Sequence, residues 1–354
     1  EDRPDEFHGL GPFSVETGKV TGSGPKPLSY TAVFGEAIIA EAERDERVVA
    51  ITAAMPAGTG LTRFAERFPE RFFDVGIAEQ HAVGLAAGLA HGGQVPVVAV
   101  YSTFLQRAYD QVIMDAALQG LHMVFCLDRA GLVGEDGPTH HGVFDLSYLR
   151  AIPGLQIMAP ADEAELVHML HTAIEADGPV AIRYPRGSGR GVALPAEPRV
   201  LEPGVSERRR TGADVELLAV GRMVGVAEEA AALLANRGVE AGVVNMRWVK
   251  PIDRTAVLEA AAAPLIVTLE ENTGEGGFGA AVLETLADAG ATAPVLRIAV
   301  PDCFVTHGKT EVLLEEIGLT ADQVCERVTS RLADLADAKG ASAHGSAQAR
   351  RRAR

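Results

Sequence analysis

Short apolar segments rich in β-branched residues alternate with helical stretches along most of this chain. Examples are VVAIT at 48–52, VPVVAVY at 95–101 and LHMVFCL at 121–127. Segments of this length and apolar content are typical of strands that are buried on both faces. A chain in which such strands alternate with helices commonly folds into a parallel sheet covered by helices. The pattern therefore predicts an α/β fold.

A break rich in Pro, Gly and Arg divides this alternation into two parts. We expect two consecutive three-layer α/β/α domains, at 29–190 and 213–337, joined by a linker at 191–212. Residues 1–28 are rich in Gly and Pro, which is typical of an extended linker. Residues 338–354 have little apolar content, and we expect them to be a disordered basic tail.

The hydrophobic period also predicts the elements within each domain. The first domain is expected to hold helices at 30–43, 78–91, 104–118 and 162–177, and strands at 48–52, 95–101, 121–127 and 180–184. The second is expected to hold strands at 214–220, 241–246, 264–270 and 295–299, and helices at 223–237, 252–262, 277–289 and 321–336.

Composition narrows the class of protein. Of 354 residues, 47% are hydrophobic and 23% are charged, as in ordinary globular proteins. Apolar runs such as 95–100 are far shorter than the roughly 20 residues that cross a bilayer, and no basic and apolar leader opens the sequence. Cys126, Cys303 and Cys325 are far apart and form no CxxC pair, which favours a reducing compartment and argues against structural zinc. We therefore expect a soluble, cytoplasmic protein.

The net charge of −16 bears on possible partners. Lys and Arg number 32 against 48 Asp and Glu, and the last 17 residues hold five of the basic side chains and no acid. So acidic a surface repels nucleic acid and anionic membranes, and we expect neither as a partner. An anionic small molecule would have to be bound by local arginines.

The segment DVGIAEQHAVGLAAGLA, at 74–90, places Glu79 in the first turn of an apolar helix rich in Gly and Ala. Two interpretations remain open. The carboxylate could merely complement the helix dipole. It could instead be a buried carboxylate held for catalysis, since acids in so apolar a segment are unusual.

Tyr101, Phe104 and Arg107 lie where a predicted strand passes into a helix, in YSTFLQRAYDQ at 101–111. Their spacing could bring an aromatic face and a cation to one ligand. The alternative is a core Phe and a surface Arg.

The Gly-rich segment DRAGLVGEDGPTHHGVFD, at 128–145, follows another predicted strand. It carries five polar side chains that could meet a substrate, since functional residues concentrate in loops on a rigid scaffold: Arg129, Glu135, Asp136, His140 and His141.

A further strand ends in IRYPRG at 182–187, where Arg183 and Arg186 could bind a phosphate by charge-assisted hydrogen bonds.

Other motifs favour a structural role. GEGGFG at 274–279 is interpreted as a close-packed turn, because no acid ends a following strand as a dinucleotide site requires. His168 and His171 are interpreted as a solvated helix face rather than as metal ligands.

Together these segments resemble the transketolase-like enzymes that use thiamine diphosphate. The resemblance is strongest to the 1-deoxy-D-xylulose 5-phosphate synthase family. It runs from about Phe7 to Leu335 and rests on the motifs quoted above together with MAPADEAEL, LEENTGEGGFG and PDCFVTHG, while FHGLGPF is similar to that family's interdomain linker.

The resemblance implies a cofactor site. Glu79 would hydrogen-bond N1′ of the aminopyrimidine and favour the imino tautomer that takes the proton from thiazolium C2. Phe104 would stack on the pyrimidine ring. Ile77 is assigned to the same cofactor site.

The resemblance also implies substrates and a reaction. Tyr101, Arg129 and Arg186 would bind the phosphate and hydroxyls of D-glyceraldehyde 3-phosphate. Asp136 and His140 would position the pyruvate-derived group and transfer protons, with the division of proton transfers among them and His141 left open. The implied reaction is loss of CO2 from pyruvate followed by carbon–carbon bond formation with the aldehyde.

One departure from the family is informative. These enzymes hold the diphosphate through Mg²⁺ with a GDG motif and a later Asn, but no GDG occurs here and the first Asn is Asn236. We therefore expect no metal ligands in this chain. The chain would correspond to the pyrimidine-binding and C-terminal domains, would need an N-terminal diphosphate-binding half as partner, and would form a homodimer. The alternatives are a transketolase, a 2-oxoacid dehydrogenase β subunit, and a non-catalytic homodimeric module.

Overall fold

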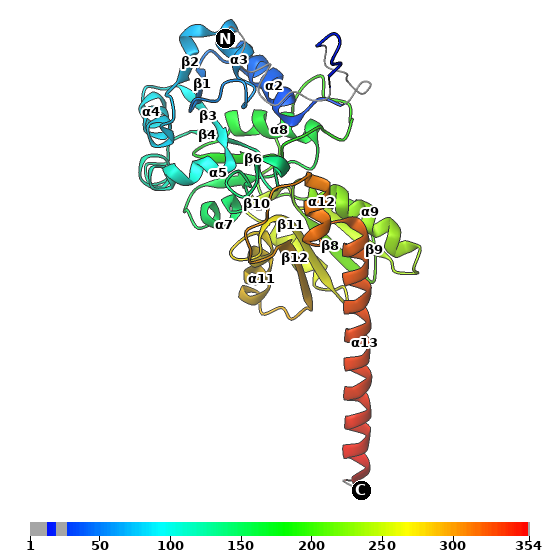
Figure 1. Ribbon diagram of the computed structural model, residues 1–354. Helices are drawn as coiled ribbons and strands as arrows, with labels where there is room; N and C mark the ends of the chain where they lie inside the picture. The colour runs from blue at the N-terminus through cyan, green and yellow to red at the C-terminus, as the bar shows by residue number, and fades with distance from the viewer. Residues whose placement is uncertain (1–12, 19–26, 353–354) are drawn as a thin grey trace.

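The computed structural model describes residues 13–18 and 27–352 of the chain. They form two lobes, each built on a β-sheet, and a long C-terminal helix that extends away from the second lobe (Figure 1). The predicted α/β class and the two-domain arrangement are confirmed. Most of the linker expected at 1–28 lies outside the described residues. Among the residues that are described, no helix is both long and apolar enough to cross a membrane.

The first sheet has seven strands in the order β10-β5-β6-β4-β3-β1-β2, and only the pairing of β10 with β5 is antiparallel. Its strands are β1 (Val48–Thr52), β2 (Phe72–Asp74), β3 (Val95–Tyr101), β4 (Val124–Asp128), β5 (Gln156–Met158), β6 (Val180–Arg183) and β10 (Trp248–Lys250). In β3, Val97 and Ala99 belong to the core on one face, and Val98 and Val100 to the core on the other. Both faces are covered, which explains why this strand is apolar throughout.

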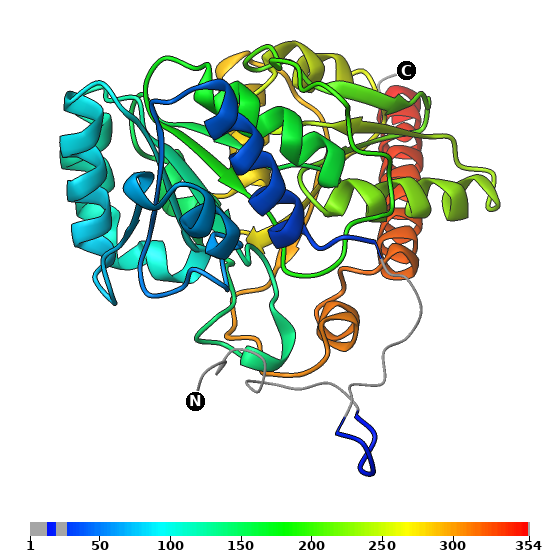
Figure 2. The same cartoon turned by 90° about the horizontal axis from the view of Figure 1, so that it is seen from above.

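Helices cover the two faces of the first sheet. One face carries α2 (Tyr30–Arg44) and α8 (Glu163–Ile174), which lie side by side in Figure 2, together with α3 (Thr62–Arg67) and the turn η1 (Pro69–Arg71). The other face carries α4 (Glu79–His91), α7 (Asp145–Arg150) and the segment 102–117. The starts of α2 and α8 are fixed by the side chains of Ser29 and Asp162, which accept hydrogen bonds from backbone N–H groups of the first turn.

The second sheet has the order β12-β11-β8-β9-β7, with β7 antiparallel to β9. Its elements are β7 (Glu207–Arg210), β8 (Val215–Ala219), α9 (Met223–Ala235), β9 (Ala241–Asn245), α10 (Arg254–Ala260), β11 (Ile266–Thr273), α11 (Phe278–Asp288), β12 (Val295–Val300), α12 (Thr310–Glu316) and α13 (Ala321–Arg352). Residues of α9 and α13 share one core, whereas those of α10 and α11 join a core that continues into the first domain. The two domains are therefore joined by a common apolar core.

Two predicted elements differ from the structure. The helix expected at 104–118 is divided into α5 (Ser102–Leu105), the turn η2 (Gln106–Ala108), α6 (Tyr109–Gln111) and the π-helix η3 (Val112–Ala117). No Pro or Gly in the sequence signals these breaks. The tail expected to be disordered from residue 338 is helical as far as Arg352. Val324, Cys325 and Val328 pack the start of α13 on the second domain, and an Ala-rich continuation can extend a helix once it has begun.

Four strands were not predicted from the hydrophobic pattern: β2, β5, β7 and β10. Strand β7 falls within the linker expected at 191–212, and its sequence ERRR carries no apolar alternation. It pairs with β9 at a sheet edge, where charged side chains are common, and Arg208 also forms an ion pair with Glu216 of β8. Strand β10 adds residues of the second half of the chain to the first sheet. The exact boundaries of the two predicted domains remain predictions.

Candidate active site

The predicted site residues gather at one edge of the first sheet. Strands β3, β4 and β6 are parallel neighbours, so that their carboxyl ends lie together. Tyr101 ends β3, Asp128 ends β4 and is followed by Arg129, and Arg183 ends β6. Ligands in open α/β sheets bind at this edge.

Three aromatic rings and a guanidinium form the centre of the cluster. The Tyr101 and Phe104 rings are stacked with centroids 5.5 Å apart, and the His140 ring meets Phe104 edge-on at 5.3 Å. The Arg129 guanidinium lies 3.8 Å from the Tyr101 ring centroid. Burial raises the pKa of the Tyr101 hydroxyl above its usual value, although Arg129 opposes the shift, so the hydroxyl stays protonated at neutral pH and can donate to a ligand.

Glu79 is joined to this cluster through Arg107. The Glu79 residue is only 2% exposed and lies in the first turn of α4, which no side chain caps. Arg107 Nη1 donates to Glu79 Oε1 at 2.9 Å, and the same guanidinium carbon lies 5.1 Å from the Phe104 ring centroid. The carboxylate is therefore both buried and close to the helix dipole. Ile77, in contrast, is 81% exposed.

The backbone of Arg129 is held in an unusual conformation. Its φ of 62° lies in the left-handed region, which a residue other than Gly rarely adopts and which often marks a functional site. Its Nη1 donates to the carbonyl of Gly58 at 2.7 Å and lies 3.1 Å from Asp128 Oδ1. The guanidinium is thereby fixed against Tyr101.

Asp128 is a residue of this site that the sequence analysis missed. It is fully buried, and its Oδ2 accepts a hydrogen bond from Thr31 Oγ1 at 2.7 Å, whereas its Oδ1 makes only the ion pair with Arg129. Burial raises the pKa of Asp128 to about 6, and Arg129 partly opposes this shift. The only signal in the sequence was an acid at the end of an otherwise apolar strand.

Asp136, on the loop after β4, and Arg186, just after β6, form a half-exposed ion pair. Arg186 Nη1 lies 2.8 Å from Asp136 Oδ2 and donates to the carbonyl of Val133 at 3.0 Å. Arg183, which the sequence analysis paired with Arg186 as a phosphate ligand, has a side chain only 5% exposed that donates to Asp145. That expectation was wrong for Arg183, because its position within β6 directs the side chain into the protein.

The two neighbouring histidines of the loop differ in accessibility. His141 is buried: its Nδ1 accepts from the Val133 N–H at 3.1 Å, so Nε2 carries the proton and donates to the carbonyl of Thr306 at 3.0 Å. Both nitrogens are occupied within the fold. His140 is partly exposed, and its Nδ1 lies 2.9 Å from Thr139 Oγ1. His140 is therefore the histidine that can meet a substrate.

Two hollows border the cluster. The first, of about 470 Å³, has Phe104, Arg107 and Thr139 in its wall together with the exposed Phe304 of the second domain. The second, of about 650 Å³, lies between the domains and is lined mainly by polar groups, among them Arg186, Arg222, Lys309, Glu135 and Glu311.

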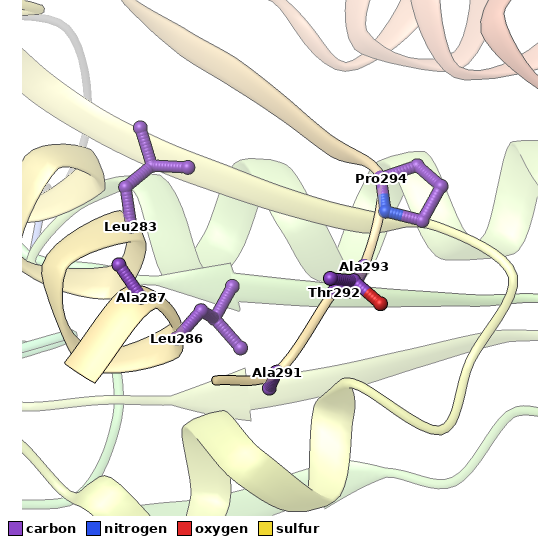
Figure 3. Close-up of a pocket in the computed structure, with 7 residues that line it drawn as sticks. All are labelled: Leu283, Leu286, Ala287, Ala291, Thr292, Ala293 and Pro294. Atoms are coloured by element: carbon purple, nitrogen blue, oxygen red, sulfur yellow. The ribbon is translucent and has the colours of Figure 1, made fainter. Parts of the chain in front are cut away.

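A third hollow, of about 430 Å³, is apolar and lies elsewhere (Figure 3). It is formed by the end of α11 and the segment leading into β12, with Leu283, Leu286 and Pro294 in its wall. Strand β12 begins there, whereas the cluster lies beside the end of its parallel neighbour β11. The apolar hollow is therefore at the opposite edge of the second sheet and plays no part in this site.

The cluster suits an aromatic, nitrogen-containing ring but not a metal ion. Phe104 offers a partly exposed ring in the wall of a hollow, and Glu79 offers a buried carboxylate whose Oε2 accepts no hydrogen bond from any described residue. Nowhere in the described part of the chain do three His, Cys, Asp or Glu side chains gather closely enough to hold a metal. His168 and His171 are occupied, the first by the Arg199 N–H and the second by Glu41.

Comparison with known proteins identifies the family. Residues 26–191 match the family model for the transketolase pyrimidine-binding domain, and residues 204–324 match the one for the transketolase C-terminal domain. A solved structure described as a split gene transketolase, an inactive beta4 tetramer, superposes with a TM-score of 0.78. It is 33% identical, and the match covers 87% of this chain and 99% of that chain. The chain belongs to the transketolase family.

Curated relatives of this transketolase-family chain carry a more specific name. The 1-deoxy-D-xylulose-5-phosphate synthase 1 of Geobacter sulfurreducens is 56% identical over 345 residues, which are 97% of this chain and 54% of that protein. The synthase of Syntrophomonas wolfei is 54% identical over 94% of this chain and 52% of its own length. The resemblance predicted from the motifs is confirmed. The chain spans about half the length of the curated relatives that it matches.

Proposed function

We propose that this chain forms the pyrimidine-binding and C-terminal part of an enzyme that makes 1-deoxy-D-xylulose 5-phosphate from pyruvate and D-glyceraldehyde 3-phosphate. The observation that carries the proposal is the cluster itself. Tyr101, Phe104, Arg129 and His140 contact one another at the ligand-binding edge of the sheet, and Arg107 connects them to the buried Glu79. Names of curated relatives at 54–56% identity support the same reaction.

Glu79 and Phe104 are proposed to hold the aminopyrimidine of thiamine diphosphate, the cofactor on which this family depends. When bound, that cofactor supplies a nucleophilic carbon and stabilises the negative charge left when CO2 departs. Glu79 would hydrogen-bond a ring nitrogen from a buried position, where the interaction is stronger than in water. Phe104 would pack against the ring face, and Ile77 would cover it from an exposed position that a further polypeptide segment could bury.

The phosphorylated aldehyde is proposed to bind between the aromatic cluster and the interdomain hollow. Arg186 lines that hollow and is 41% exposed in its side chain, so its guanidinium can reach a phosphate. Arg129 and Tyr101 face the same region and would bind hydroxyls. His140 and Asp136 would position the pyruvate-derived group and move protons, because His141 has both nitrogens occupied.

The diphosphate and its Mg²⁺ are proposed to be held by a polypeptide that corresponds to the other half of the curated relatives. The residues described here offer no cluster of metal ligands. The match to the split gene transketolase covers 99% of that chain. In that protein, therefore, a polypeptide with these two domains is a chain of its own. A homodimer and a cytoplasmic location remain predictions.

Calorimetric titration tests whether the cofactor site is divided between this chain and a diphosphate-binding polypeptide. Thiamine diphosphate with Mg²⁺ is titrated into this chain alone, into the diphosphate-binding half of the Geobacter sulfurreducens synthase alone, and into the two combined. We expect tight binding only for the combination. Micromolar, Mg²⁺-dependent binding to this chain alone would contradict the proposed division, and no binding by a combination that forms a stable complex would contradict the proposed cofactor.

A further inference from the structure

The loop that carries Asp136 and His140 is closed at its base by a pair of backbone hydrogen bonds. The Gly131 N–H donates to the Gly142 carbonyl at 2.7 Å, and the Gly142 N–H donates to the Gly131 carbonyl at 2.8 Å. Arg129 immediately precedes this closure. The position of the base therefore sets where Arg129 leaves the sheet edge and where the loop places Asp136 and His140.

A glutamate of the second domain contacts this base directly. Glu271 lies on β11 and is only 3% exposed, and its Oε1 accepts the Leu132 N–H at 2.7 Å. Gly131 has φ 81°, and a Cβ atom added there would lie 2.3 Å from the Glu271 carboxyl carbon. A side chain at position 131 would therefore have to displace this carboxylate, and the positive φ independently favours Gly.

The charge of Glu271 is balanced by Arg222, at the start of α9. Arg222 Nε donates to Glu271 Oε2 at 2.9 Å, and its Nη2 contacts Oε1. A two-point contact of this kind fixes the orientation of the carboxylate as well as neutralising it. Oε1 is therefore aimed at the loop by a residue that itself lines the interdomain hollow.

The main chain of Glu271 holds the other side of the same base. Arg183 Nη2 lies 3.1 Å from the Glu271 carbonyl oxygen and 3.2 Å from the Gly142 carbonyl oxygen, and it donates to both. Its Nε donates to Asp145. Glu271 consequently reaches both strands of the loop base, Leu132 through its carboxylate and Gly142 through Arg183.

We propose that Glu271, oriented by Arg222, is a positioning residue through which the second domain fixes the substrate loop. Without touching a substrate, it would hold Arg129, Asp136 and His140 in the arrangement that binds the phosphorylated aldehyde. The catalytic part of this inference rests on the proposed function, whereas the structural part does not. The C-terminal domain would then help to position the residues of the active site.

A second ion pair between the domains supplies a matched control. Arg150 donates to both oxygens of Glu284, at 2.8 and 2.7 Å, and among the described residues no hydrogen bond or ion pair joins either side chain to the loop at 131–142. The substitutions Glu271→Gln and Glu284→Gln each remove one negative charge from an interdomain pair. Only Glu271→Gln is expected to release the loop.

Hydrogen exchange followed by mass spectrometry tests the structural part on this chain. In Glu271→Gln, peptides covering 130–142 are expected to exchange about tenfold faster than in the unmodified chain, and in Glu284→Gln at the original rate. Unchanged exchange in Glu271→Gln, or equal acceleration in both variants, overturns the proposal. If Glu271→Gln does not fold, Arg222→Gln is measured instead, with the same two outcomes.

The catalytic part is tested in the combination with the diphosphate-binding half. Glu271→Gln is expected to raise KM for D-glyceraldehyde 3-phosphate about tenfold while changing pyruvate decarboxylation without aldehyde much less. Equal losses in both reactions would contradict the proposal that Glu271 positions the residues that bind the aldehyde. If the unmodified combination is inactive, the proposed function fails, but the exchange result still decides whether Glu271 fixes the loop.

Discussion

Arg107 donates a hydrogen bond from Nη1 to Oε1 of Glu79 at 2.9 Å, although the Arg107 side chain is 52% exposed and that of Glu79 only 3%. The buried carboxylate is therefore oriented by a cation at the surface of the cluster. Because the other carboxylate oxygen accepts no hydrogen bond from a described residue, Glu79 can bind a further donor without losing this partner.

Glu79→Gln should abolish activation of the cofactor in the completed enzyme. An amide cannot replace the carboxyl in proton transfer, and positioned acid–base groups contribute about 10²- to 10⁴-fold to rates. We expect kcat to fall by at least about a hundredfold, measured as CO2 release from pyruvate. The control is Glu36→Gln, which removes an exposed carboxylate paired with Arg63. Near-normal turnover in Glu79→Gln would refute the assigned role.

Phe104→Leu should weaken cofactor binding without unfolding the chain. Stacking of two rings contributes about 0.5–1.5 kcal/mol beyond burial, so we expect the Kd for thiamine diphosphate to rise roughly 2- to 10-fold. Calorimetry on the combination with the diphosphate-binding half measures this change. Phe68→Leu, on the opposite face of the sheet, should leave Kd unchanged, and an equal change in both variants would argue against a specific contact.

Substitution by Gln should weaken substrate binding at Arg186 and lower the stability of the fold at Arg183. The Arg186–Asp136 pair is about 40% exposed on both sides and adds little stability, but loss of its charge should raise KM for the phosphorylated aldehyde about tenfold. Arg183→Gln leaves the buried Asp145 without its ion-pair partner, which typically costs about 3–5 kcal/mol. Urea denaturation and steady-state kinetics on both variants measure the two effects. A stable Arg183→Gln variant would contradict the assignment.

Asp128 should make stability depend on pH in a definite direction. Its pKa of about 6 in the folded state lies above the ordinary value of 3.8, so the folded form binds the proton more tightly. The resulting stabilisation is complete below pH 3.8 and is lost as pH rises through 6. Asp128→Asn cannot ionise. Its stability relative to the unmodified chain should therefore increase by about 2 kcal/mol between pH 4 and 7.

Asp45 provides the control for that experiment. Hydrogen bonds from Arg47 hold the pKa of Asp45 below its usual value, so its contribution to stability is present above the unfolded pKa and is lost as pH falls. Below about pH 4 the stability of Asp45→Asn relative to the unmodified chain should therefore rise as pH falls, whereas that of Asp128→Asn falls as pH is lowered from 7 to 4. A constant difference between Asp128→Asn and the unmodified chain across this range would contradict the burial of an ionisable Asp128.

Much of the fold could be predicted because buried strands and amphipathic helices have distinct periods. VVAIT and VPVVAVY became β1 and β3 with the bounds expected from the sequence. The hydrophobic period cannot indicate β7, whose ERRR sequence has no apolar alternation and is held by backbone pairing to β9 and by ion pairs such as Arg208–Glu216. Nor can it indicate the breaks within 102–117. It also missed the continuation of α13, because low apolar content does not prevent an Ala-rich helix from extending.

The site was less predictable where burial decides a residue's role. Arg183 and Arg186 look equivalent in IRYPRG, and only the structure shows that the first is enclosed and the second accessible. The contact between Glu271 and Leu132 joins residues 139 positions apart. Nothing local in the sequence could indicate it, because it depends on how the two domains pack.

Identification of the reaction product decides whether the two halves together make 1-deoxy-D-xylulose 5-phosphate. The chain is combined with the diphosphate-binding half of the Geobacter sulfurreducens synthase, thiamine diphosphate, Mg²⁺, D-glyceraldehyde 3-phosphate and pyruvate labelled at its keto carbon, and the products are followed by NMR. We expect labelled 1-deoxy-D-xylulose 5-phosphate, with none formed by either half alone. A stable combination that gives no labelled sugar phosphate, or one that transfers only a two-carbon unit from a ketose phosphate, would contradict the proposed function.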